Sequence, residues 1–168
     1  MTDFDTRFRE LFQTEYPRLF RYLDRLSGEP DLAADLAQEA FIRLNRRGAM
    51  PDCPASWLVT VAMNLFRNLR STEARRRRLL TEARVESVLA DPTPTQYQTS
   101  TAAESQERVR SALDRLPERE QRLLLLRAEG YSYKEMAAAL QLNEASIGTL
   151  LARAKRSFRR VYEGFDAS

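Results

Sequence analysis

The stretch from Gly130 to Arg160 constrains the fold more than any other part of the chain, because it predicts two short helices joined by a tight turn. Ser132 and Glu135 have the spacing of a capping box at the start of the first helix. Asn143, eleven residues after Ser132, is a good N-cap for the second helix. The chain is therefore expected to contain a helix-turn-helix unit.

The second of these helices is amphipathic and strongly basic. Its apolar positions Ile147, Leu150 and Leu151 should face the first helix. Five cations follow with no acid among them: Arg153, Lys155, Arg156, Arg159 and Arg160. This pattern is typical of a helix that enters the major groove of DNA while its cations contact phosphate. The alternative is an αα-hairpin in a helical bundle with a solvated basic face.

Composition favours an all-α fold. The chain has 168 residues, 43% of them hydrophobic and five of them Gly, with no strand-like alternation. This length admits one domain or two small ones. A net charge of +3 points mildly to an anionic partner.

Residue types exclude several chemistries. The chain has no His and only one cysteine, Cys53, so it has neither a His/Cys zinc site nor a Cys-His nucleophile. A Gly-rich phosphate loop is also absent, and we expect no enzyme, no metal and no cofactor. A single thiol, the lack of a signal-peptide pattern and the lack of a long apolar run predict a cytoplasmic protein without membrane insertion.

Two amphipathic segments open the chain. Apolar residues at helical spacing predict one or two helices from Asp3 to Leu26, with Pro17 as the joint. After a turn at residues 27–31, a further helix should bury Leu32, Leu36, Ala40 and Leu44. A second face of that helix carries Asp35, Gln38, Glu39 and Ile42. This face suits a basic partner, and the alternative is a solvated acidic surface.

A loop rich in turn residues precedes the next helix, which is predicted from Ser56 to about Arg78. Trp57 and Phe66 lie on it beside amide and guanidinium side chains, which can stack unpaired bases and hold their backbone. The alternative for Trp57 is an ordinary place in the core, the commoner outcome for a lone Trp.

The helical pattern ends between Leu79 and Ser100, where Thr, Pro and Gln predict an extended, mobile linker. Two more helices are expected before the helix-turn-helix, one opening at Thr101 and one near Pro117. We therefore predict two small helical domains: residues 1–80, a linker at 81–100, and residues 101–168.

Four motifs in this order carry a family resemblance: DLAADLAQEAFIRL at 31–44, W-L-x-x-x-A-x-N at 57–64, LPERE at 116–120 and the helix-turn-helix. Together they resemble the extracytoplasmic-function group of bacterial RNA polymerase sigma factors. The resemblance covers nearly the whole chain. It implies a non-catalytic subunit that binds core RNA polymerase and directs promoter-specific initiation.

The resemblance also implies where each partner binds. The beta-prime clamp helices of the polymerase would contact Asp35, Gln38, Glu39 and Ile42. The minus-ten element would be captured and melted by Met50, Asp52, Trp57, Asn64, Arg67, Asn68 and Arg70. The minus-35 element would be read by Ser146, Gly148, Thr149, Arg153, Lys155, Arg156 and Arg159. Further expected partners are the beta subunit and an anti-sigma factor.

Three positions depart from the family pattern. Asn68 stands where an Asp is common, and Gly148 and Leu150 stand where the recognition helix often has cations. The two changes in the recognition helix, at Gly148 and Leu150, bear on the strength and manner of the minus-35 contact. The alternative function is a free-standing helix-turn-helix regulator, whose N-terminal part should look like a ligand-binding or dimerisation domain.

Overall fold

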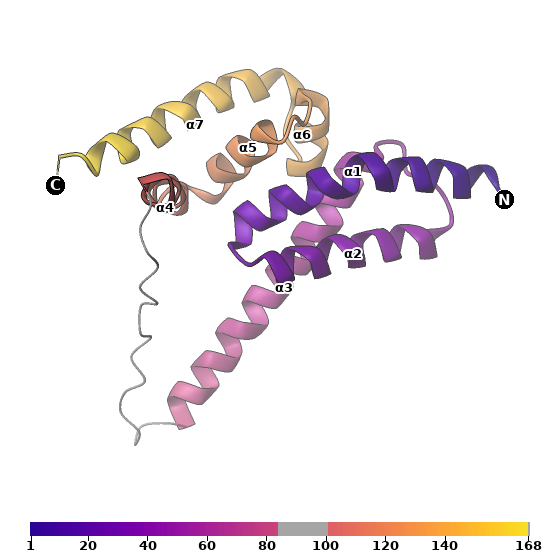
Figure 1. Ribbon diagram of the computed structural model, residues 1–168, viewed down its shortest axis with the longest axis horizontal. Helices are drawn as coiled ribbons and strands as arrows, with labels where there is room; N and C mark the ends of the chain where they lie inside the picture. The colour runs from indigo at the N-terminus through magenta and orange to yellow at the C-terminus, as the bar shows by residue number, and fades with distance from the viewer. Residues whose placement is uncertain (84–100, 168) are drawn as a thin grey trace.

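The computed structural model describes residues 1–83 and 101–167, and within these ranges it holds seven α-helices and no strand (Figure 1). The N-terminal bundle consists of α1 (Asp3–Ser27), α2 (Pro30–Arg47) and α3 (Pro54–Ala83). The C-terminal bundle consists of α4 (Thr101–Asp114), α5 (Glu118–Ala128), α6 (Tyr133–Leu140) and α7 (Glu144–Gly164). The all-α prediction is confirmed. None of the helices in the described part of the chain is both long and apolar enough to cross a membrane.

The first helix is continuous, so the predicted joint at Pro17 is wrong. A capping box between Thr2 and Asp5 starts α1, and Gly28 ends it in the left-handed conformation with φ of 71°. Proline removes one backbone donor from the helix interior. Leu19 and Leu23, which follow it, are buried in the core, so packing stabilises the helix beyond the proline.

The second helix begins one residue before the predicted start, with Pro30 in its first turn. Leu36, Ala40 and Leu44 are buried as expected, whereas Leu32 is only partly buried. The helix ends at Gly48, which also has a positive φ, of 69°. This glycine turns the chain into the loop that precedes α3.

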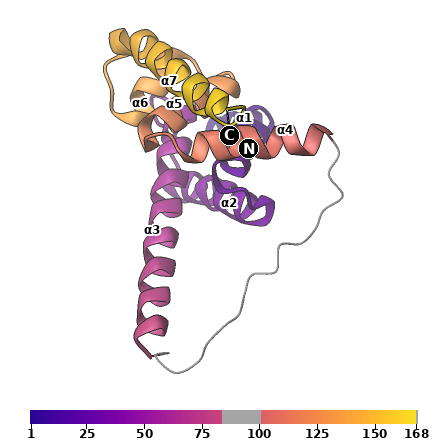
Figure 2. The same cartoon turned by 90° about the vertical axis from the view of Figure 1, so that its left-hand side faces the viewer.

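The third helix is packed in its first half and projects from the bundle in its second half (Figure 2). Leu58, Val59 and Ala62 are buried. From Arg67 to Thr81 every side chain is exposed. We call residues 67–83 the α3 arm.

The helix-turn-helix has the predicted boundaries. Ser132 caps α6 by accepting from the backbone N–H of Glu135 at 3.1 Å, and Asn143 caps α7 by accepting from that of Ala145 at 3.0 Å. Between the helices, Gln141 adopts a positive φ of 56°. The capping box predicted at Ser132 is only half formed, because the Glu135 carboxylate binds Arg18 of α1.

The two bundles pack against each other and share one hydrophobic core. Tyr22 of α1 and Tyr131, just before α6, meet edge to face with ring centroids 6.4 Å apart. Both are buried, which raises the pKa of each phenol above its ordinary value. This close packing was not predicted from the sequence, which indicated only two bundles and a linker.

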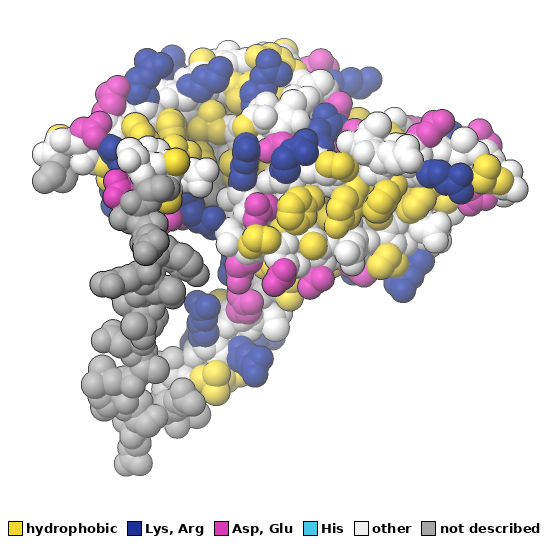
Figure 3. Space-filling model, in the orientation of Figure 1, with side chains coloured by type: hydrophobic (Ala, Val, Ile, Leu, Met, Phe, Trp, Pro, Cys, Tyr) yellow, Lys and Arg dark blue, Asp and Glu magenta, His cyan; other side chains and the backbone are white. Residues whose placement is uncertain are grey.

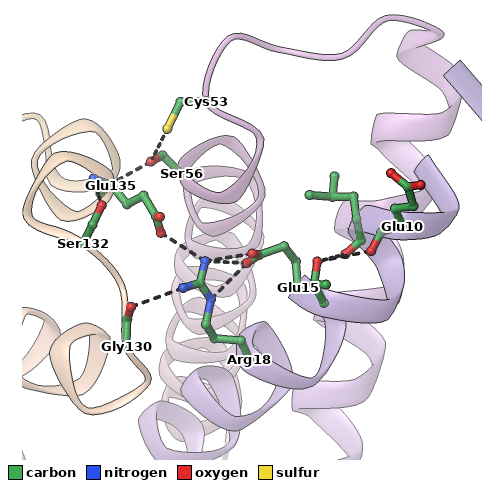
Figure 4. A network of polar contacts seen from close by, with 10 residues as sticks. Glu10, Glu15, Arg18, Cys53, Ser56, Gly130, Ser132 and Glu135 are labelled. Atoms are coloured by element: carbon green, nitrogen blue, oxygen red, sulfur yellow. Dashed lines mark hydrogen bonds and ion pairs between the residues drawn. The ribbon is translucent and has the colours of Figure 1, made fainter. Parts of the chain in front are cut away.

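Polar contacts surround this shared core, and Arg18 lies at their centre (Figure 4). Its guanidinium donates to Glu15 at 2.7 Å, to Glu135 at 3.0 Å and to the carbonyl oxygen of Gly130 at 3.3 Å. From α3, Ser56 donates its hydroxyl proton to the backbone oxygen of Glu135 at 2.9 Å. We call this set of contacts the Arg18 latch.

A second acidic side chain joins the bundles beside the latch. Arg21 and Arg25 of α1 both pair with Glu129, at 2.8 and 2.9 Å, and the Glu129 side chain is only 5% exposed. The predicted linker falls almost entirely on residues 84–100, which lie outside the described residues. Its first three positions, 81–83, belong to α3.

Candidate nucleic-acid interface

The basic face of α7 is open to solvent. The following predicted DNA contacts are all exposed: Ser146, Thr149, Arg153, Lys155, Arg156 and Arg159. Ile147 and Leu151 on the opposite side are buried against the rest of the bundle. Local sequence explains this arrangement, because the apolar positions recur at helical spacing and the cations fall between them. The helix therefore presents a basic side to solvent.

A hollow lies at the N-terminal end of α7, and its lining includes Tyr133, Asn143, Ala145 and Gly148. Gly148 is half-buried, and a methyl group added there would lie 3.6 Å from the Tyr133 ring, an ordinary contact. The absence of a side chain at Gly148 thus leaves Tyr133 accessible, at 41% exposure. The guanidinium of Arg127 lies 5.5 Å from the centre of this ring. Tyr133 was not among the residues predicted from the sequence, although it lies in the first turn of the predicted helix.

Arg153 has an intramolecular partner that the sequence did not reveal. Its Nε lies 3.8 Å from Oε1 of Glu120 in α5, while the Arg153 side chain remains 68% exposed. At this distance and exposure the attraction is weak. Arg153 can therefore exchange Glu120 for a ligand at small cost.

The polar face of α3 is also accessible. Asn64, Arg67 and Asn68 are exposed, and the Asn64 side-chain oxygen accepts from Arg67 at 3.3 Å. Arg70 is less available, because it pairs with Glu29 at 3.2 Å and with Glu73 at 3.4 Å. The structure thus brings the predicted residues together on one helix face and shows that Arg70 has competing acidic partners.

The loop before α3 contains the other predicted contacts. Met50 is half-buried and Asp52 is exposed. Trp57 is also half-buried. This burial fits neither alternative fully, because a core Trp would be buried and a base-stacking Trp would be exposed. The Arg47 guanidinium lies 5.9 Å from the centre of the Trp57 rings.

A different surface, formed by α1 and α2, combines acidic and apolar side chains. Asp35 and Gln38 are exposed, Ile42 is 43% exposed, and Glu39 pairs with Arg43 at 3.2 Å. A row of hydrophobic side chains runs beside it between α1 and α2 (Figure 3). Phe12, 41% exposed, belongs to an aromatic cluster in which its ring meets that of Phe41 with centroids 5.0 Å apart.

No group of three or more His, Cys, Asp or Glu side chains in residues 1–83 and 101–167 could hold a metal ion. An all-helical chain with a basic second helix in a helix-turn-helix belongs to the helix-turn-helix class of proteins.

Comparison with known families narrows this class. Residues 11–76 match the sigma-70 region 2 family and residues 106–158 match the sigma-70 region 4 family. The EcfG extracytoplasmic-function sigma factor of Rhodopseudomonas palustris is 35% identical, over 84% of this chain and 75% of EcfG. The chain therefore belongs to the extracytoplasmic-function RNA polymerase sigma factors.

Two further relatives show how far the similarity extends. The SigE factor of Mycolicibacterium smegmatis is 32% identical over 89% of this chain, but the chain spans only 59% of SigE. Among solved structures, the Bartonella quintana sigma factor RpoE in complex with the anti-sigma factor NepR matches with a TM-score of 0.67. That match covers 94% of this chain and 98% of RpoE at 21% identity, which establishes the same fold.

Proposed function

We propose that this protein binds core RNA polymerase in the cytoplasm and directs initiation at specific promoters without catalysing a reaction itself. The observation that carries the proposal is the presence of two exposed polar and basic helix faces, on α3 and α7, in one chain of the sigma-factor family. Two separate DNA surfaces suit a promoter with two separate elements.

Each face receives one role in this proposal. The α7 residues around Arg153 read the minus-35 element, with base edges in the major groove facing the first turns of the helix. The α3 face at Asn64 and the loop before Trp57 capture the minus-ten element. Opening DNA requires that unpaired bases be held, and a half-buried Trp beside amides can hold them.

The acidic and apolar face of α2 binds core RNA polymerase in this proposal. Asp35 and Glu39 offer carboxylates, and Ile42 offers an apolar contact beside Phe12. A mixed surface of this kind favours a helical partner with complementary charge, as the beta-prime clamp helices are expected to be. The beta subunit is the further polymerase contact in this proposal.

An anti-sigma factor is the proposed inhibitory partner. Its support is the related fold of RpoE, which was solved in complex with the anti-sigma factor NepR. The packing of the two bundles also leaves the basic face of α7 exposed. A separate protein would therefore be needed to block DNA binding by this face.

The competing proposal is a free-standing helix-turn-helix regulator, which needs α7 but has no use for the α2 and α3 faces. A run-off transcription assay separates the two. The purified chain, added to core polymerase that lacks any sigma factor, should give promoter-dependent transcripts. A chain that binds promoter DNA alone but gives no transcripts with core would be a regulator.

A further inference from the structure

The ion pairs that join the two bundles, in the part of the chain that the structure describes, all set arginines of α1 against glutamates of the C-terminal bundle. Arg18 pairs with Glu135, and Arg21 and Arg25 pair with Glu129. The three arginines are spaced three and four residues apart, so they lie on one face of α1. We call them the α1 basic row. The acidic partner of this row is built into the same chain.

Glu129 and its two arginines depend on the packing to different degrees. The Glu129 side chain is only 5% exposed, whereas those of Arg21 and Arg25 are 53% and 54% exposed. A buried carboxylate is unfavourable unless nearby cations compensate for its lost hydration. Without the two arginines, Glu129 would regain hydration only if the bundles separated. The charge at positions 21 and 25 therefore controls whether the bundles stay packed.

The same packing places α6 beside the loop that is proposed to capture the minus-ten element, residues 48–53 (Figure 4). Ser56, buried in the first turn of α3, donates to the backbone oxygen of Glu135 in α6 at 2.9 Å. The sulfur of Cys53, the last residue of the loop, lies 3.0 Å from the Ser56 hydroxyl oxygen. While the bundles are packed, the C-terminal bundle thus restrains the end of the minus-ten loop.

The packing also limits the distance between the two DNA faces. From the contact of Ser56 with Glu135, Asn64 is about 12 Å along α3, and Arg153 is within about 35 Å along α6, the turn and α7. The faces at Asn64 and Arg153 are therefore at most about 55 Å apart. By their names, the two promoter elements are separated by about 25 base pairs, or about 85 Å of DNA. The packed chain cannot place both faces on one promoter at once.

We propose that the packed arrangement is a closed, autoinhibited form, held by the α1 basic row, that can contact one promoter element but not both. The inference rests on the proposed function, because only a promoter with two elements requires the faces to separate. The covalent connection permits opening, since the chain from Ala83 to Thr101 can extend to about 60 Å. Together with the α3 arm, which is about 24 Å long, this reach matches the distance between the elements.

The first test locks the bundles together in the full chain. In the variant R21C/E129C, two thiols replace an ion pair whose atoms lie 2.8 Å apart, so a short crosslinker with a reducible disulfide can join them. Added to core polymerase, the locked chain should give at least tenfold fewer promoter-dependent run-off transcripts than the same variant without crosslinker. Reduction of the crosslinker should restore the transcripts. The single variants R21C and E129C, treated identically, account for reaction at Cys53.

The second test opens the bundles by charge. R21E/R25E sets two acids against Glu129, and R21E/R25E/E129K restores attraction with the signs reversed. The matched control R7E/R9E makes the same change of charge at exposed positions of the same helix. Without polymerase, R21E/R25E should bind a forked probe with both elements and a single-stranded minus-ten segment at least tenfold more tightly than the control, because two linked contacts reinforce each other. The triple variant should bind like the control.

Affinity for a duplex with the minus-35 element alone should be the same in R21E/R25E and R7E/R9E, because the α7 face is exposed in the closed form. Unchanged transcription by the locked chain would overturn the inference, and so would equal affinity of these two variants for the two-element probe. A gain by R21E/R25E on the minus-35 duplex alone would show instead that closure masks α7. Failure of the proposed function looks different, because the wild-type chain would then give no promoter-dependent transcripts with core polymerase.

Discussion

Arg153 differs from the other cations of α7 in its position and in its partner. It is the first long side chain after the N-terminal turns, and it can exchange the weak contact with Glu120 for a bidentate bond to guanine. Arg156, one turn further along, is placed for phosphate. The two residues should therefore contribute in different ways to DNA binding.

We predict that Arg153→Ala costs about 1 to 3 kcal/mol on the preferred minus-35 sequence and removes discrimination at one base pair. Arg156→Ala should weaken all sequences alike and lower the salt slope by about 1. Binding of each variant to a randomised minus-35 library, at two salt concentrations, measures both effects. If both variants lose affinity uniformly across the library, then Arg153 contacts only phosphate, and DNA shape selects the promoter.

Asn64 offers a second prediction at the residue scale. It is exposed at the packed end of the α3 face, with its oxygen 3.3 Å from Arg67. Asn64→Ala should reduce opening of promoter DNA, measured by permanganate reactivity of unpaired thymines, more than it reduces closed-complex binding. The reason is that the amide contacts are made only with unpaired bases. An equal reduction of both would mean that Asn64 only supports the fold.

At the scale of elements, α2 concentrates the contacts proposed for the polymerase. Its buried side packs Leu36, Ala40 and Leu44 into the core, so substitutions on its opposite face should leave the fold intact. The pairing of Glu39 with Arg43 means that a Lys at position 39 would also repel Arg43, by about 0.2 to 0.5 kcal/mol. This local cost is too small to unfold the helix.

Reversing Asp35 and Glu39 to Lys should therefore weaken binding to core polymerase at least tenfold, while circular dichroism stays unchanged. The matched control is the reversal of Glu104 and Glu107 to Lys, which changes the charge equally on α4 of the other bundle. Affinity for core can be measured by fluorescence anisotropy of a labelled chain. Undiminished affinity of the α2 variant, or an equal loss in the α4 control, would refute the assignment.

At the scale of the whole molecule, the Arg18 latch holds the two bundles together. The Arg18 side chain is 17% exposed and that of Glu135 is 25% exposed, so solvent screens their 3.0 Å pair only in part. Hydrogen bonds to charged groups contribute about 1.5 to 3 kcal/mol each. Two of the latch bonds from Arg18 cross between the bundles.

Arg18→Ala should thus raise the population of separated bundles at least tenfold. The measurement is the radius of gyration by small-angle X-ray scattering, or energy transfer between dyes on α2 and α7. Arg43→Ala serves as the control, because it removes an arginine ion pair that lies within α2 alone. An identical radius of gyration for the wild type and both variants would show that the shared apolar core suffices to hold the bundles closed.

The sequence by itself determined the helices and the faces of this protein. Caps such as Ser132 and Asn143 bind backbone groups two or three residues away, and the spacing of Ile147 and Leu151 fixes the buried side of α7. These are local interactions, so a linear pattern contains them. The family resemblance used the same local motifs, and the family matches confirmed it.

Tertiary structure decided how these elements meet. The spacing of Glu135 predicts a capping box, yet its carboxylate binds Arg18, 117 positions earlier in the chain. Pro17 predicts a joint, yet α1 continues through it and packs the residues that follow into the core. In both cases a long-range contact outweighed the local preference. The physical reason is that a partner distant in sequence adds burial and charge pairing, which no short stretch of residues encodes.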